Sequence, residues 1–171
     1  MFANPAYAKP SLTGTEPILL KIPSLQIEAP IKPLGVNEMY QVPADGQSVF
    51  WYKDGINPGG KGSAVIAGHF DDYEGPAVFY PLRSIQAGEM VYILDRDNHL
   101  LMFEVEEITS FPRENTSVED IFKTSGQPYL ILVTCEGFYN RTQQTHTHRL
   151  VVKAKRVGTY HTYRPKTERV E

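Results

Sequence analysis

The feature that most constrains this chain is an apolar run that ends in its only cysteine. Residues 130–134 are aliphatic or β-branched, Tyr129 precedes them and Cys135 follows them directly. A run of this length and composition is typical of a buried strand. We therefore expect Cys135 at the C-terminal end of a strand, where a long loop over residues 136–147 begins. A rigid sheet holds a thiol at such a point far better than a mobile tail does.

Two other apolar runs carry a polar side chain at one end. Residues 63–68 lead into His69, and Arg149 opens a run that continues to residue 154. Cysteine, histidine and arginine at three strand ends can act as a nucleophile, a proton-transfer group and an oxyanion donor. We expect these three side chains to converge as a catalytic site. In the alternative interpretation, Cys135 is a small buried apolar residue and the other two are ordinary surface groups.

The rest of the chain predicts an all-β fold. Thirteen prolines, thirteen glycines and eighteen tyrosines and phenylalanines favour short strands joined by turns. The predicted fold is a closed eight-stranded β-barrel with one or two short helices, and a sandwich is the alternative. Helical turns are expected at 77–82 and at 118–122, the second with Ser117 as N-cap. The expected strands are 18–23, 27–31, 49–52, 63–69, 90–94, 100–108, 129–135 and 148–154.

The organisation along the chain is that of one domain with short flanking segments. Residues 1–16 are rich in turn-forming residues and predict an N-terminal linker. Residues 17–157 contain every expected strand and predict the catalytic domain. Residues 158–171 predict a polar C-terminal tail. No apolar run approaches the roughly 20 residues that span a bilayer, and no signal peptide begins the chain. The chain is then either soluble as it stands or begins after a removed anchor.

Composition argues against several classes of partner. The formal net charge is −3 and no basic cluster stands out, so we expect no nucleic-acid partner. A single cysteine excludes an intrachain disulfide. Cys135, His69, His146 and His148 could together hold zinc, but no C-x-x-C or H-E-x-x-H spacing is present. We therefore expect neither a metal nor a cofactor.

In combination, several short motifs make the chain resemble the sortases, cysteine transpeptidases anchored to the membranes of bacteria with Gram-positive-type walls. The motifs are Leu132-Val133-Thr134-Cys135, an arginine after a variable loop, and Ala67-Gly68-His69 upstream. The resemblance extends from residue 17 to 155 through the segments 22–31, 62–69, 79–82 and 88–89. It is closest to the class E/F or class D-like sortases.

The resemblance implies a sortase barrel and a role for each site residue. Cys135 would be the nucleophile, His69 the general acid/base, and Arg149 the oxyanion-stabilising or substrate-orienting residue. Ala67 and Thr134 match positions that line the peptide groove. The implied reaction cleaves a Leu-Pro-x-Thr-Gly-type sorting signal after its threonine through a thioester. An amine of a wall precursor or of a pilin then accepts the acyl group. The implied location is extracytoplasmic, with membrane attachment only through an anchor missing from this chain.

Two departures leave the subclass and the peptide preference open. Glu136 stands where many relatives have glycine, and residues 138–147 are rich in Arg, Gln and His. Two alternatives to the sortase reading also remain. The first is another cysteine peptidase or acyl-transferase, although the Ser-His-Gly-Cys motif of L,D-transpeptidases is absent and the His-before-Cys order differs from NlpC/P60 peptidases. The second is a non-catalytic β-barrel binding module in which Cys135 is inert.

Overall fold

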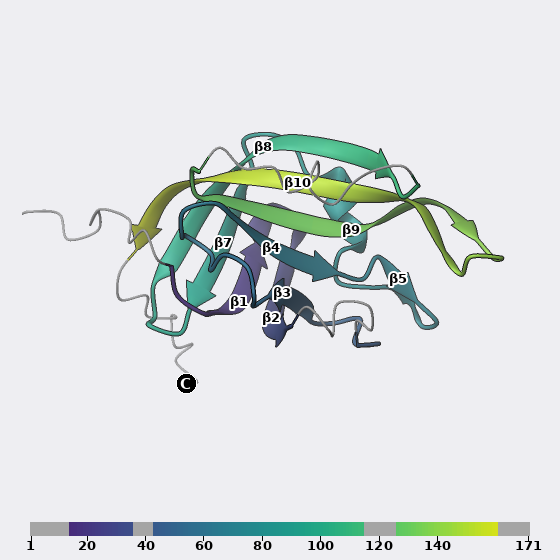
Figure 1. The fold of residues 1–171 in the computed structure, drawn as a ribbon, viewed down its shortest axis with the longest axis horizontal. Coiled ribbons are helices and arrows are strands. Elements are labelled where there is room, and N and C mark those ends of the chain that lie inside the picture. The colour runs from purple at the N-terminus through teal and green to yellow at the C-terminus, as the bar shows by residue number, and fades with distance from the viewer. Residues whose placement is uncertain (1–13, 36–42, 115–125, 161–171) are drawn as a thin grey trace, which may run out of the picture.

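Eight strands close into a barrel in the order β1-β2-β3-β4-β9-β10-β8-β7 (Figure 1). The computed structural model describes residues 14–35, 43–114 and 126–160. The closed eight-stranded barrel confirms the predicted fold class. The barrel strands are β1 (Pro17–Ile22), β2 (Ile27–Leu34), β3 (Val49–Tyr52), β4 (Ser63–Gly68), β7 (Met90–Asp95), β8 (Leu100–Pro112), β9 (Tyr129–Asn140) and β10 (Thr145–Tyr160).

Short elements connect these strands. The strands β5 (Asp71–Asp72) and β6 (Gly75–Pro76) form a small hairpin directly after β4. Within the described residues the helical segments are two 3₁₀ turns, η1 (Pro23–Leu25) and η2 (Tyr80–Ser84). The second lies about three residues later than the expected turn at 77–82. The helix expected at 118–122, with its cap Ser117, lies outside the described residues.

Strand alternation divides the apolar residues of β9 between two faces of the sheet. Leu130 and Leu132 are fully buried in the main core inside the barrel. Ile131 belongs instead to a second cluster with Val65 and Val151. Successive side chains of a strand point to opposite faces, so Cys135 follows Ile131 onto the outer face. Residues 130–132 are all apolar because both faces of the strand are covered there.

The strands around Cys135 are longer than the sequence predicts. β9 does not end at Cys135 but continues to Asn140, and β10 already begins at Thr145. The expected loop over residues 136–147 is therefore wrong. The ladder continues through polar pairs, which hydrophobic patterning does not detect. A bulge beside Gly137 (φ 82°) shifts the register, and the two strands pair again beyond it. The resulting hairpin extends beyond the barrel beside β5 (Figure 1).

The tight end of this hairpin is held by one side chain. Asn140 Oδ1 accepts hydrogen bonds from the backbone N–H groups of Thr142 (3.0 Å) and Gln143 (3.1 Å). This is the local side-chain-to-backbone bonding that favours asparagine in turns. A short turn therefore replaces the expected long loop, and both strands can position side chains well beyond Cys135.

The first and last described residues of the chain are held against the barrel. Thr15 donates a hydrogen bond to Asp95, and the N–H of Arg96 donates to the carbonyl of Glu16. At the C-terminal end, β10 runs to Tyr160, past residue 158, where we expect the tail to begin, and Thr159 is buried.

Among the described residues, no helix has the length and apolar character needed to cross a membrane.

Candidate active site

Cys135 and Arg149 are direct partners in the antiparallel ladder between β9 and β10. Side chains at opposed positions of such a ladder lie on the same face, with Cβ atoms about 4.5–5.5 Å apart. The structure therefore brings together two of the three residues that the sequence singles out. From the sequence we expect Arg149 at the start of its strand. The structure instead begins β10 at Thr145, four residues before Arg149.

His69 lies on the other side of Cys135. β4 runs parallel to β9, and their last aligned pair is Ala67 with Val133. The hydroxyl of Thr134 donates to the carbonyl of Gly68 at 2.8 Å, which continues the contact by one residue. Since the two strands advance in step, His69 comes level with Cys135. The three residues thus lie on adjacent strands, with the cysteine in the middle.

The backbone around His69 is fixed from two sides. A Cβ atom on Gly68 would lie 2.5 Å from the ring of Phe79, which is fully buried, so only glycine fits there. The N–H of Phe79 donates to the carbonyl of His69 at 3.0 Å. The imidazole Nε2 lies 2.8 Å from the carbonyl oxygen of Pro43, and the ring of Phe50 meets it edge-on at 6.2 Å between centroids. These contacts give His69 a defined direction.

The guanidinium of Arg149 is held by its own strand. Nη1 donates to the carbonyl oxygens of His146 (3.1 Å) and His148 (3.0 Å), and Nη2 donates to Thr145 Oγ1 (3.1 Å). A guanidinium has five N–H donors, so three bonds leave two donors for other acceptors. Arg149 is therefore both anchored and able to bind a substrate oxygen.

The thiol of Cys135 is half-buried, and its surroundings both raise and lower its pKa. Burial raises the pKa of Cys135 above its ordinary value, since a thiolate loses solvation there. The cations Arg149 and Arg113 oppose this rise in pKa, while the carboxylate of Asp71 adds to it. Burial is the largest cause, so the neutral thiol is the favoured resting form.

An apolar strip follows the same face of the sheet away from Cys135. Val65, Ile131 and Val151 form its buried centre. Tyr52, Phe111 and Val133 pack against them and are only partly buried. Ala67, the partner of Val133 in the ladder, is also partly exposed. The strip therefore offers an apolar surface that leads up to the thiol.

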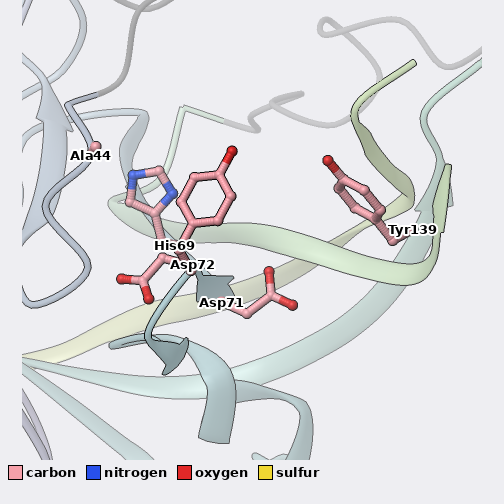
Figure 2. Close-up of a pocket in the computed structure, with 6 residues that line it drawn as sticks. Ala44, His69, Asp71, Asp72 and Tyr139 are labelled. Carbon is pink, nitrogen blue, oxygen red and sulfur yellow. The ribbon is translucent and has the colours of Figure 1, made fainter. Parts of the chain in front are cut away.

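His69 also lines a pocket. Its volume is about 450 Å³, and it is lined by Ala44, His69, Asp71, Asp72, Tyr73 and Tyr139. Figure 2 shows His69 facing this space, with Tyr139 of the extended hairpin across from it and Asp71 between them. Sequence patterns give no indication of this pocket, because its walls come from three separate segments.

Thr134 does not line an outer groove as the resemblance implies. Its side chain is 3% exposed, and its hydroxyl is bonded to Gly68. Thr134 alternates with Cys135 along β9 and so points inward. Its contribution is to fix the strand that leads into His69. Ala67 does lie on the outer face beside the apolar strip, as its partnership with Val133 requires.

Several residues near the site were not singled out by sequence reasoning. Asp71 and Arg113 both act on the thiol, and Phe79 fills the space beside Gly68. Asp71 and Arg113 belong to no motif, and the sequence of the segment 79–82 does not show that Phe79 contacts Gly68, so only the folded chain reveals these contacts. Within the described ranges, no three His, Cys, Asp or Glu side chains gather as a metal site requires.

The chain is similar to known proteins over most of its length. A family model described as the Sortase domain matches residues 20–157. The chain belongs to the sortase family. Sortases are extracellular or membrane-associated transpeptidases that act on sorting signals with cell-wall or pilin acceptors. No curated protein matches this sortase by sequence.

Solved sortase structures share the fold of this sortase at low sequence identity. Sortase A from Listeria monocytogenes is similar with a TM-score of 0.64 at 16% identity, covering 85% of this chain and 90% of that one. Sortase A from Corynebacterium diphtheriae gives 0.68 at 20% identity, over 90% and 64% of the two chains. The Clostridium perfringens sortase D5 transpeptidase gives 0.61 at 20% identity, over 84% and 79%.

Proposed function

We propose that this sortase cleaves sorting signals of the Leu-Pro-x-Thr-Gly type after the threonine and transfers the acyl group to an amine. Cys135 is the nucleophile, His69 the general acid/base and Arg149 the residue that orients the substrate carbonyl. The observation that carries the proposal is the placement of Cys135 between Arg149, its ladder partner, and the end of the strand that leads into His69. Residues 17–157 are the proposed catalytic domain, and the enzyme works outside the cytoplasm.

The resting thiol must lose its proton as it attacks. Because burial favours the neutral form of Cys135, the proton passes to the imidazole of His69 as the sulfur bonds to the threonine carbonyl carbon. Arg149 has two N–H donors left after its three anchoring bonds, and these donate hydrogen bonds to the developing oxyanion. The carbon–nitrogen bond then breaks, and His69 returns its proton to the leaving glycine amine.

The second half of the reaction reverses these roles. An acceptor amine attacks the carbonyl carbon of the thioester and gives up a proton to His69. The carbon–sulfur bond breaks, and the sulfur of Cys135 takes that proton back as a neutral thiol. The raised pKa of Cys135 favours this return to the neutral form. Overall, one peptide bond is broken and another is formed, with no change in the enzyme.

The apolar strip suits the peptide that enters. Val133, Phe111 and Tyr52 are partly exposed around the buried centre of the strip, and the leucine and proline of a sorting signal can cover them. Burying such side chains contributes about 25 cal/mol for each Å² of apolar surface removed from water. In this proposal, the strip holds the leucine and proline while the threonine carbonyl reaches the thiol.

A peptide library tests the proposal directly. The wild-type chain is incubated with Leu-Pro-x-Thr-Gly peptides varied at each position, with and without triglycine, and the products are identified by mass spectrometry. We expect cleavage after threonine and an amide product when triglycine is present. Cys135→Ala should abolish both products, and His69→Ala and Arg149→Ala should lower them by about a hundredfold or more. Full activity in Cys135→Ala, or ligand binding with no cleavage by the wild type, would contradict the proposal.

A further inference from the structure

His146 is a buried ionisable residue that the proposed reaction does not use. It lies on β10, and its side chain is held inside the base of the extended hairpin at 8% exposure. Its backbone carbonyl accepts a hydrogen bond from Arg149 Nη1 at 3.1 Å. The residue therefore touches the arginine of the site through its main chain, while its ring points elsewhere.

Both nitrogens of the His146 ring face hydrogen-bond acceptors. Nδ1 lies 3.3 Å from the carbonyl oxygen of Gly137, and Nε2 lies 3.1 Å from Asp71 Oδ1. A carbonyl oxygen and an ionised carboxylate can only accept. A neutral imidazole has one N–H, whereas an imidazolium has two. Only the doubly protonated ring donates to both partners at once.

Aromatic rings enclose the same imidazole. Phe70 meets it edge-on at 5.5 Å between centroids, and Tyr139 does so at 5.4 Å. The titratable groups in contact with the ring are thus Asp71 from β5 and Tyr139 from β9, while Phe70 carries no charge. On its own strand, the nearest charge is Arg149, bonded to the His146 carbonyl. The ring is largely shielded from water, whereas the Asp71 side chain is 48% exposed; its carboxylate is the one anion bonded to this ring among the described residues.

The contact joins segments that are far apart along the chain. Asp71 lies two residues after His69, and its carboxylate also acts on the thiol of Cys135. Gly137 lies two residues after Cys135, at the bulge in β9. One imidazole therefore connects the backbone that follows His69, the backbone that follows Cys135 and the backbone that anchors Arg149.

We propose that His146 is a positioning residue of this sortase site: clamped between Gly137 and Asp71, it fixes the β9–β10 hairpin and Arg149 against the segment that carries His69. The consequence for catalysis rests on the proposed function. The clamp itself does not, because it is a property of the folded chain. Loss of the imidazole removes the contacts with Gly137 and Asp71 and loosens the hairpin.

Nuclear magnetic resonance of the full, ¹⁵N-labelled chain tests the clamp without any substrate. We expect Asp71→Asn to move the ring nitrogen signals of His146 and to leave those of His99 unchanged, because the His146 ring contacts Asp71 and the His99 ring contacts Asp95. His146 ring signals that are the same in wild type and Asp71→Asn overturn the proposal, whether or not the chain cleaves peptides.

Kinetics test the positioning role with a matched control. His99 also contacts a carboxylate, Asp95, at 3.1 Å, but in the hairpin between β7 and β8. We expect His146→Phe to lower kcat for a sorting peptide about tenfold or more with KM changed less than twofold, because small displacements of catalytic groups have large effects on rate. His146→Gln, whose amide can still donate to Asp71, should recover part of this loss. His99→Phe should leave kcat within twofold of wild type.

The outcomes separate positioning from general stability. Melting temperature is measured for every variant, since each change can destabilise its hairpin. Equal losses of kcat in His146→Phe and His99→Phe, or no loss in His146→Phe, overturn the positioning role. If His146→Phe does not fold, the kcat of His146→Gln tests the positioning role, and the ring spectra of wild type and Asp71→Asn test the clamp. A wild type that cleaves no peptide counts against the proposed function, and the ring spectrum then tests the clamp alone.

Discussion

The hydroxyl of Thr134 donates a hydrogen bond to the carbonyl of Gly68 at 2.8 Å, across the parallel strands β9 and β4. The two residues immediately precede Cys135 and His69. The aligned ladder between these strands ends one residue earlier, at Ala67 and Val133. A side chain therefore extends the alignment to the residues that directly precede the proposed nucleophile and base.

Removing this hydroxyl should weaken both the fold and the reaction. Thr134→Val keeps the shape of the side chain but removes the hydroxyl that donates to the partly buried carbonyl of Gly68, at a cost of about 1–3 kcal/mol of unfolding free energy. We expect kcat to fall because His69 is no longer tied to Cys135. Urea denaturation and peptide cleavage measure the two effects. Thr134→Ser keeps the hydroxyl, and a loss in the serine variant as large as in valine would contradict this role.

The close contact between Gly68 and Phe79 predicts a pair of coupled substitutions. Gly68→Ala places a Cβ atom 2.5 Å from a ring that is fully buried and cannot move aside. Overpacking of this kind costs about 1–3 kcal/mol. Phe79→Leu opens space but loses buried surface. The double variant should be more stable than the sum of the two single losses predicts, as measured by a double-mutant cycle in denaturant. Strict additivity would show that the ring does not restrict this position.

Alkylation of Cys135 by iodoacetamide should report the electrostatics of the site. Burial raises the pKa of the thiol, so the alkylation rate should reach half its maximum at a higher pH than for free cysteine. Arg149 lowers that pKa, so Arg149→Ala should move the midpoint to still higher pH. Arg149→Lys keeps a positive charge and serves as the control, with a midpoint near that of wild type. A wild-type midpoint below that of free cysteine would contradict this account of the thiol.

Enlarging Ala67 should separate peptide binding from thiol chemistry. Ala67 lies beside Val133 on the outer face, next to the apolar strip. Ala67→Leu adds bulk where we propose that the peptide packs, so KM for the sorting peptide should rise about tenfold, or roughly 1.4 kcal/mol. The alkylation rate of Cys135 by iodoacetamide should stay unchanged, because a small reagent does not need the strip. An unchanged KM would place the peptide elsewhere.

Much of the barrel could be predicted from local sequence patterns. Apolar runs flanked by turn residues located all eight strands, because a strand with covered faces must be apolar. The short motif around Cys135 and the glycine before His69 also indicated the family. The extent of β9 and β10 could not be predicted, since the pairs beyond Cys135 are polar and their partners lie across a turn. Asn140, which closes that turn, is one polar residue among many in the sequence.

By itself, the sequence determined which residues form the barrel and which reactive side chains stand next to its strands. The register decided the rest: it placed Arg149 opposite Cys135, turned Thr134 inward and brought Asp71 to the ring of His146. These are contacts between residues separated by up to 75 positions. Local propensity is blind to them, because a shift of one residue in strand pairing moves every side chain to the opposite face.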